Sequence, residues 1–405
     1  MRALTGTGGS NPSPSATPCL KCRSGELTMM QCVRGELICT GKTTRKHAFL
    51  VFDGQRILGI SDTPRGTVAG TCAVLTPAFI DPHSHIGIHR HGEPGGESES
   101  NDTLDSILPL PDVLDSVQMD DGAFRTAVES GTLYSCVVPG SANLIGGLSA
   151  VVRHCAPHSS AALIGRAGIK AALGYNIMAY GGSKGTRPST RRGALAVLRA
   201  RLDAVRTRVA KAAKARGGEP LSREEQVLKG ILDGKTLLRV HAHKIDDIAA
   251  LIRLADELKL RVSVEHAMDV NRPEIFAELR KRRITVVYGP IETTSSKVEL
   301  LHKHWSNARL LIASGVGFCV MTDHPVTPAW TLLQQMRPLL RCGLSKQDAL
   351  ETLTRKAAAF LGLDDRLGTL DRGKWASFIC WSGDPFDLAS RPLAVYAEGQ
   401  PVFQE

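Results

Sequence analysis

The chain has 405 residues, 42% hydrophobic and 22% charged, a globular composition on a length that suits two or three domains. Only 5% of the residues are aromatic, which counts against a stacking platform for single-stranded nucleic acid. No apolar run reaches the ~20 residues that span a bilayer, and the first thirty residues hold no apolar block of signal-peptide length. We therefore expect a soluble, cytoplasmic protein with no membrane partner and with its ten cysteines reduced.

The net charge of +10 is confined to one segment, residues 184–216. The only acid there is Asp203, and the excess comes from eleven basic residues: Lys184, Arg187, Arg191, Arg192, Arg199, Arg201, Arg206, Arg208, Lys211, Lys214 and Arg216. Apolar residues recur at the spacing of one helix face, formed by Leu195, Leu198, Leu202 and Val205. The arginines are then either a solvated helix face or a surface that binds polyanions.

The first 25 residues are rich in Ser, Pro, Gly and Thr without periodicity, which predicts a disordered tail over 1–25. Cys19 and Cys22 form a CxxC in this tail. The next cysteines, Cys32 and Cys39, are spaced too widely for the second pair of a zinc ribbon. We expect no metal role for these cysteines.

Both ends of the remaining chain have the pattern of short strands broken by turns. In the N-terminal part, Asp53 and Gly54 form a DG pair that is typical of a hairpin. The last forty residues have similar apolar runs interrupted by Gly, Asp and Pro. We predict a small β-sandwich domain assembled from both termini, residues 26–72 and 366–405.

The middle of the chain alternates strand and helix patterns, which is typical of α/β folds with parallel strands. Helical segments such as 245–260 and 272–282 separate several of eight candidate strands: 73–81, 132–138, 148–154, 165–173, 236–242, 261–266, 284–289 and 316–323. About 250 residues is the usual size of an eightfold β/α barrel. An open doubly wound sheet is the alternative, but the Gly-rich dinucleotide motif that would favour it follows none of these strands. We predict an α/β protein with a TIM-type (β/α)8 barrel over residues 73–365.

Ionisable side chains stand at the carboxyl ends of these strands, where barrel enzymes place their catalytic groups. The first strand ends in DPHSH, with His83 and His85, and the fifth ends in HAH, with His241 and His243. Residues two apart in an extended segment project from the same side, so each pair can bind one ion. Three other strands supply Lys170, His266 and Asp323. Each residue alone has an ordinary structural explanation, but their coincidence at separate strand ends indicates a metal site.

This pattern resembles the amidohydrolase superfamily of metal-dependent hydrolases. The resemblance covers roughly residues 36–405 and includes the phrases LTPAFIDPHSH and LGTLDRGKWASFICWSGDPFD. The runs GSANLIGG, GIKAALG, RVHAHKIDDI and MTDHPV are most similar to imidazolonepropionase-related and other poorly characterised bacterial amidohydrolases. One departure is Ser377, where the family commonly has Asp.

The resemblance implies a set of metal ligands: His83, His85, Lys170, His241, His266 and Asp323. The pair on the first strand and Asp323 would bind the more buried ion. Lys170 would bridge to a second ion only as a carbamate formed with CO₂, because a free ammonium cannot ligate a cation. In related branches the fourth-strand residue is not a ligand and the enzyme uses one metal, so the resemblance allows either one or two ions. Zinc is expected, and iron or manganese would suit the same ligands.

The resemblance also implies hydrolysis of an amide or related C–N bond, cyclic or linear, in a small molecule. A bound metal lowers the pKa of water to about 7 and polarises the scissile carbonyl. Asp323 would act as general base and then protonate the leaving nitrogen, and His243 would face the substrate as a second catalytic residue. Loops after three strands offer further substrate contacts: His89, His91, Asn143 and His324.

Two alternatives stay open. The same site would serve a deaminase of an amino-substituted ring if Glu265 or Glu292 lay near the ring as an acid. A protein of a different class would use segment 184–216 to bind a polyanion, although the complete ligand set makes nucleic acid an unlikely partner. The sequence identifies neither the substrate nor an interface for the homo-oligomers that are common among such barrels.

Overall fold

The computed structural model describes residues 30–179, 187–214, 219–293 and 297–405. The predicted disordered tail, with Cys19 and Cys22, lies outside these residues, as do Lys184 and Arg216 of the basic segment. In the described part of the chain, no helix is both long enough and apolar enough to cross a membrane.

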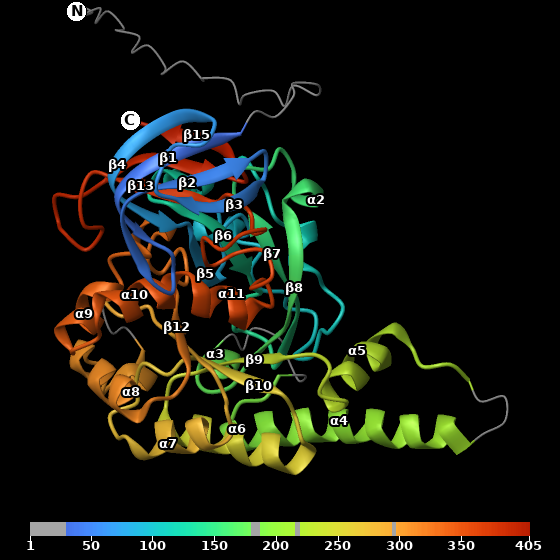
Figure 1. Cartoon of the computed structure of the whole chain (residues 1–405). Helices are drawn as coiled ribbons and strands as arrows, with labels where there is room; N and C mark the ends of the chain where they lie inside the picture. The colour runs from blue at the N-terminus through green and yellow to red at the C-terminus, as the bar shows by residue number, and fades with distance from the viewer. Residues whose placement is uncertain (1–29, 180–186, 215–218, 294–296) are drawn as a thin grey trace, which may run out of the picture.

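An eight-stranded sheet forms the larger part of the molecule (Figure 1). In spatial and chain order its strands are β5 (Phe79–Ser84), β6 (Thr132–Val137), β7 (Ile145–Arg153), β8 (Leu163–Ala172), β9 (Leu238–Ala242), β10 (Val262–His266), β11 (Val286–Tyr288) and β12 (Phe318–Val320). Asp323 N donates to His83 O at 3.1 Å, and His85 N donates to His324 O at 2.9 Å. These bonds join the segment after β12 to the end of β5, so the sheet is a nearly closed barrel of the predicted TIM type.

One strand departs from the predicted parallel arrangement. β7 runs antiparallel to both β6 and β8, whereas the other neighbouring strands of the barrel are parallel. The connections on either side of β7, residues 138–144 and 154–162, are shorter than the dozen or more residues that a parallel crossover needs. Expecting eight equivalent β/α units was therefore wrong at this strand.

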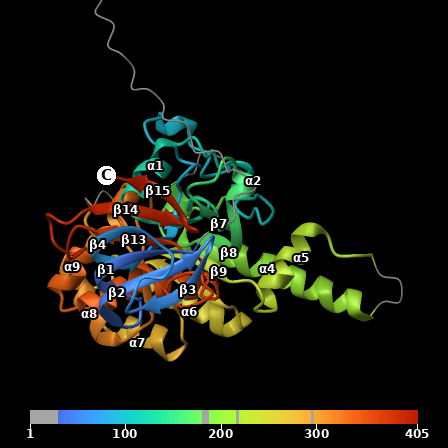
Figure 2. The ribbon, with the colours of Figure 1, turned by 45° about the horizontal axis from the view of Figure 1, so that its top comes forward.

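The strands of both termini join in one seven-stranded sheet (Figure 2). Its order is β15 (Gln400–Gln404), β14 (Pro392–Ala397), β13 (Phe378–Trp381), β4 (Thr67–Pro77), β1 (Gln31–Cys39), β2 (Thr44–Asp53) and β3 (Arg56–Ser61). The predicted hairpin at Asp53 and Gly54 connects β2 to β3. The two-sheet sandwich that we expected is not confirmed. The candidate strand 73–81 divides between β4 and the barrel strand β5, so β4 crosses the predicted boundary after residue 72.

Aromatic side chains form the core of the terminal sheet. The rings of Phe378 and Tyr396 stack at 4.5 Å between centroids, and Phe52 meets Phe378 edge-on at 5.4 Å. Ser377, which departs from the family phrase, joins this sheet to the barrel, because its Oγ lies 2.7 Å from the hydroxyl of Tyr134 on β6.

The helices lie outside the barrel strands (Figure 1). They are α1 (Gly122–Glu129), α2 (Ser159–Ala162), α3 (Asn176–Ala179), α4 (Arg191–Lys214), α5 (Arg223–Leu232), α6 (Ile245–Leu258), α7 (Glu274–Lys281), α8 (Ala308–Ser314), α9 (Met336–Arg341), α10 (Lys346–Leu353) and α11 (Arg355–Leu361). Short 3₁₀ turns are η1 (Gly95–Glu97), η2 (Val113–Asp115), η3 (Val298–Leu300), η4 (Trp305–Asn307) and η5 (Ala329–Thr331). The helical predictions over 245–260 and 272–282 correspond to α6 and α7.

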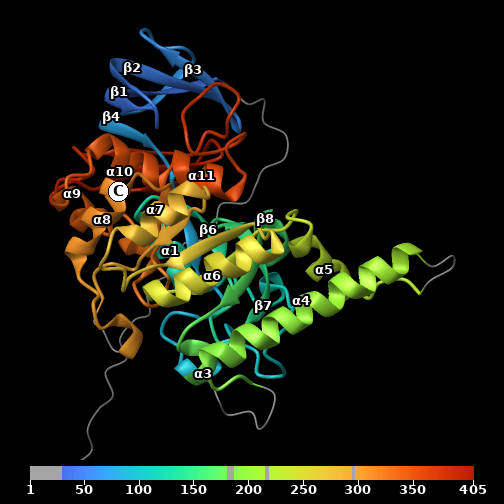
Figure 3. The ribbon, with the colours of Figure 1, turned by 90° about the horizontal axis from the view of Figure 1, so that it is seen from below.

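Helices α4 and α5 form an arm that projects from the barrel (Figures 1 and 3). The predicted apolar face of α4 is confirmed, since Leu198, Leu202 and Val205 are buried and Leu195 is partly buried. Acidic residues from neighbouring segments pair with its arginines: Arg191 with Asp247, Arg199 with Glu257, Arg201 with Glu224, and Arg208 with Glu219. These partners neutralise much of the local charge, so the polyanion-binding alternative is not favoured.

Candidate metal centre

The carboxyl ends of four barrel strands bring predicted metal ligands together. His83 lies in β5 and His241 in β9, His266 ends β10, and Asp323 follows β12. These side chains form two buried groups. The first group is His83, His266 and Asp323, and the second group is His241, His243 and His266. In each group, every residue has a donor atom within 4.8 Å of a donor atom of the other two. His266 belongs to both groups, so the two groups adjoin.

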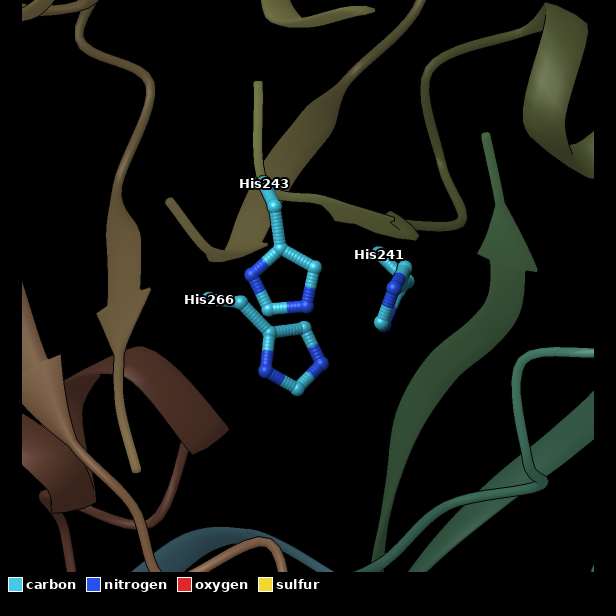
Figure 4. Close-up of side chains that lie close together, drawn as sticks. All are labelled: His241, His243 and His266. Atoms are coloured by element: carbon cyan, nitrogen blue, oxygen red, sulfur yellow. The ribbon is translucent and has the colours of Figure 1, made fainter. Parts of the chain in front are cut away.

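The second group differs from the expected one. His243, predicted to face the substrate, lies with its ring centroid 4.7 Å from both His241 and His266, and the rings of His241 and His266 are 4.2 Å apart (Figure 4). His85 stays near the first group, with its Nε2 3.3 Å from Asp323 Oδ1. The structure thus brings His83, His85, His241, His266 and Asp323 together and adds His243. Lys170, the sixth predicted ligand, is near enough to contribute to the lowered pKa of His85, His241 and His266.

Hydrogen bonds from the protein orient three of these imidazoles. Each Nδ1 lies against an oxygen: His83 against Glu265 Oε2 at 2.7 Å, His85 against the Val138 carbonyl at 2.7 Å, and His266 against the Gly289 carbonyl at 2.9 Å. A neutral ring that donates its Nδ1–H has its lone pair on Nε2. Three Nε2 lone pairs are therefore available to a cation.

Several buried nitrogens in the two groups lack a hydrogen-bond partner. They are His83 Nε2, His241 Nδ1 and His243 Nδ1. A buried polar atom without a partner is costly and calls for an explanation, such as an ion. Imidazole and carboxylate are the donors that zinc and neighbouring first-row metals bind. The residues therefore fit a metal ion at each group.

Burial sets the ionisation of these side chains. It lowers the pKa of His266 to about 3, and burial together with the neighbouring His266 lowers the pKa of His241 and His243 well below the ordinary value. Burial alone would raise the pKa of Asp323, but the imidazoles around it, His266 first, hold it well below the usual range. Neutral imidazoles and an ionised carboxylate are the forms that ligate metals.

The backbone is in the left-handed region at two candidate ligands. His266 has φ +83° and Asp323 has φ +54°, a region that residues other than glycine rarely adopt and that commonly marks functional sites. Asp81 holds the end of β12 against β5, because its Oδ1 accepts from the backbone N–H groups of His83 and Thr322 at 3.2 and 3.4 Å. Asp81 thus fixes the backbone at His83 and next to Asp323, two of the candidate ligands.

Lys170 lies on β8 and is 1% exposed. Its Nζ donates to the carbonyl oxygen of Pro139 at 3.0 Å. Burial lowers the pKa of Lys170 to about 8, so a fraction of the amine is neutral near pH 7. A neutral amine is the form that can react with CO₂, and the carbamate therefore stays a prediction for this residue.

The predicted substrate contacts have different surroundings. His324 is buried, its Nδ1 accepts from Ala329 N at 3.2 Å, and its Nε2 has no partner. His91 is exposed, with its ring centroid 6.5 Å from that of His324, and His89 is half-buried. Asn143 holds the loop after β5, because its amide donates to the carbonyls of Asp102 and Asp105. A contact between Asn143 and a substrate would have to use its Oδ1.

Glu265 does not lie where the acid of a deaminase would be needed, near a substrate ring. Its carboxylate is 0% exposed and lies behind His83, where it accepts from Arg239 Nη2 at 2.9 Å and from Ser263 Oγ at 2.6 Å. Burial alone would raise the pKa of Glu265, but the Arg239 guanidinium holds it well below the carboxylate range. Such a carboxylate cannot serve as an acid near a substrate ring. Glu292 is exposed, so the deaminase alternative is not favoured.

Sequence reasoning missed Glu299, a buried carboxylate behind the second group. Glu299 Oε1 lies 3.8 Å from His241 Nε2 and has no hydrogen-bond partner, while its Oε2 accepts from Tyr175 N at 2.9 Å. Burial raises the pKa of Glu299. Asn176 Nδ2 lies 3.4 Å from the same Nε2, so Nε2 of His241 has two polar neighbours while its Nδ1 has no hydrogen-bond partner. Glu299 follows a short strand in a 3₁₀ turn, and no local pattern singles it out.

Comparison with known proteins agrees with this geometry. The family model described as "Amidohydrolase family" matches residues 74–403. The chain belongs to the amidohydrolase family. This confirms the family that the sequence phrases and strand-end ligands indicated.

Solved structures resemble the amidohydrolase chain along nearly its whole length. An amidohydrolase from Thermotoga maritima MSB8 matches with a TM-score of 0.86 and 30% identity, covering 93% of this chain and 100% of the other. A prolidase complexed with N-methylphosphonate-L-proline matches with a TM-score of 0.58 and 18% identity, covering 93% and 100%. The latter likeness shows the fold alone.

Curated relatives match more distantly. Amidohydrolase tasK of Hapsidospora irregularis is 25% identical over 82% of this chain, and an imidazolonepropionase of Desulfotalea psychrophila is 27% identical over 41% of it. The chain spans about a third of the length of the first and two fifths of the second. The expected similarity to imidazolonepropionases is thus present over part of the chain.

Proposed function

We propose that this amidohydrolase cleaves an amide or related C–N bond, cyclic or linear, in a small molecule by metal-dependent hydrolysis. One or two divalent ions, zinc first and iron or manganese as substitutes, would be held by His83, His85 and Asp323 on one side and by His241 and His266 on the other. Lys170 as a carbamate would bridge two ions. The observation that carries the proposal is the buried group of His83, His266 and Asp323 with an unpartnered Nε2 on His83.

A bound metal would supply an activated water and polarise the scissile carbonyl. Asp323 Oδ1, which is 3.3 Å from the Nε2 atoms of His83 and His85, would accept a proton from that water and deliver it to the leaving nitrogen. His324 has Nδ1 as an acceptor, so its neutral ring carries the proton on Nε2 and would donate to a substrate oxygen. His243 would either complete the second metal group or contact the substrate.

The similar proteins guide the choice of test compounds. An imidazolonepropionase matches part of the chain, so cyclic amides are the first compounds to try, and dipeptides follow because a prolidase shares the fold. A homo-oligomer and a cytoplasmic location remain expectations from the sequence.

The test is metal removal and return. The purified protein is stripped with a chelator, its hydrolysis of dipeptides, N-acyl amino acids and cyclic amides is measured, and zinc, manganese or iron(II) is then added back. We expect hydrolysis of at least one compound to disappear on stripping and to return with metal. Equal hydrolysis by the stripped and the reloaded protein, with metal content checked by mass spectrometry, would contradict the proposal.

A further inference from the structure

A buried ion pair lies directly behind the first metal group. Arg239 on β9 and Glu265 on β10 are both 0% exposed. Besides the bond from Arg239 Nη2 to Glu265 Oε2, Arg239 Nε donates to Glu265 Oε1 at 3.2 Å. The guanidinium also stands 5.1 Å from the ring centroid of Phe360. A charge pair this deep is costly to desolvate, so its presence needs a reason.

The pair is tied to His83 in two ways. Glu265 Oε2 lies 2.7 Å from His83 Nδ1, and Arg239 Nη2 donates to the carbonyl oxygen of Pro82 at 2.5 Å. The Arg239 guanidinium therefore fixes two things: the Glu265 carboxylate that contacts the His83 ring, and the backbone carbonyl of the residue before His83. Arg239 Nη1 also lies 2.7 Å from Cys136 Sγ on β6, so the network crosses the barrel interior from β9 and β10 to β5 and β6.

We propose that Arg239 and Glu265 are positioning residues that fix the tautomer of His83. An ionised carboxylate can only accept, so His83 Nδ1 must donate, and the lone pair of the neutral ring is on Nε2. That atom has no hydrogen-bond partner and faces Asp323. Arg239 keeps Glu265 an acceptor, and Ser263 Oγ occupies its other oxygen at 2.6 Å. This inference adds to the proposed function, but the tautomer exists in the metal-free protein and is tested there independently.

The double variant R239M/E265M makes the proposal measurable, and it leaves no unpaired buried charge. Without the carboxylate, His83 Nδ1 has lost its acceptor, so the proton moves to Nε2, which lies 3.3 Å from Asp323 Oδ1. In R239M/E265Q the amide oxygen of Gln can face His83 Nδ1, because no guanidinium competes for that oxygen and Ser263 Oγ can accept from the Gln NH₂ group.

The experiment records ¹⁵N–¹H correlations of metal-free protein with labelled histidine, with the His83 signal assigned from H83Q, and measures zinc affinity against a chelator. We expect Nδ1–H in the natural protein and Nε2–H in R239M/E265M, with zinc affinity about 10–100-fold lower in R239M/E265M. R239M/E265Q should regain Nδ1–H and part of the affinity. E299Q, which changes a buried carboxylate behind His241, is the control and should leave the His83 signal unchanged.

Three results would overturn the proposal. One is Nε2–H on His83 in the natural metal-free protein, which requires no variant. The second is R239M/E265M with Nδ1–H and unchanged zinc affinity. If R239M/E265M does not fold, R239M/E265Q decides: a folded R239M/E265Q with Nε2–H on His83 would contradict the positioning role. A natural protein that binds no zinc but shows Nδ1–H would contradict the proposed function and leave the tautomer assignment supported.

Discussion

The helical arm and the barrel interior both gather charged side chains, and they differ in how deeply those charges lie. On the arm, Arg201 and Glu224 are paired at 2.5 Å with their side chains 44% and 40% exposed. In the barrel, Arg239 and Glu265 are paired at 2.9 Å with both side chains 0% exposed. Exposed pairs contribute little because water screens them, whereas a buried pair is strongly destabilised when one partner is removed. The excess positive charge of the chain therefore lies on the arm, while the proposed chemistry uses a few buried charges in the barrel.

The largest expected effect in the barrel is at Asp323. Asp323→Asn keeps the shape of the side chain and removes the proton acceptor, so we expect kcat/KM for the amide substrate to fall about 10²–10⁴-fold. Asp365→Asn is the matched control: the same change is made at a side chain that is 68% exposed, so kcat/KM should stay unchanged. Undiminished hydrolysis by a folded Asp323→Asn protein would show that the interior carboxylate is not the base.

A second change in the barrel tests the bridge between the two groups. Lys170→Met keeps the apolar stem and removes the nitrogen, so bound zinc should fall from about two ions to about one per chain, as counted by mass spectrometry. The natural protein should show a carbamate signal in ¹³C spectra after exposure to labelled bicarbonate, and the variant should not. Lys303→Met, at a half-buried lysine that donates to the Thr293 carbonyl, is the control. A single zinc and no carbamate signal in the natural protein would reduce the site to one ion.

The smallest expected effect is on the arm. Arg201→Ala breaks an exposed pair and should change the free energy of unfolding by no more than about 1 kcal/mol, with kcat/KM unchanged. Leu202→Ala, next along the same helix, removes a side chain that is 0% exposed and should cost about 2–5 kcal/mol. Denaturant unfolding of both variants measures the difference. A large loss of activity in Arg201→Ala would mean that the charges of the arm take part in function.

The sequence indicated which candidate ligands lie close together, because each stands at the end of a strand whose pattern is local. His83, His241, His266 and Asp323 could be assigned to one end of a barrel before their contacts were known. The family resemblance then supplied roles that strand patterns alone do not contain. The apolar face of α4 was predicted for the same reason, since a periodicity of three and four residues is visible within one segment.

What the sequence did not predict depends on partners far apart in the chain. Glu265 and His83 are 182 residues apart, and nothing near either one indicates that they form a hydrogen bond. The acids that neutralise the arm come mostly from α5 and α6, so counting charges within 184–216 overstated the surface charge. The antiparallel course of β7 is an exception, because the short connections on either side of it are visible in the sequence and favour antiparallel neighbours.

Anomalous X-ray scattering shows whether the two buried groups hold metal. Crystals of zinc-loaded protein would be measured at the zinc absorption edge. We predict a peak about 2.0–2.2 Å from His83 Nε2 and an oxygen of Asp323, with a second ion, when present, beside His241 and His266. Zinc-loaded crystals with no anomalous peak at either group would contradict the account.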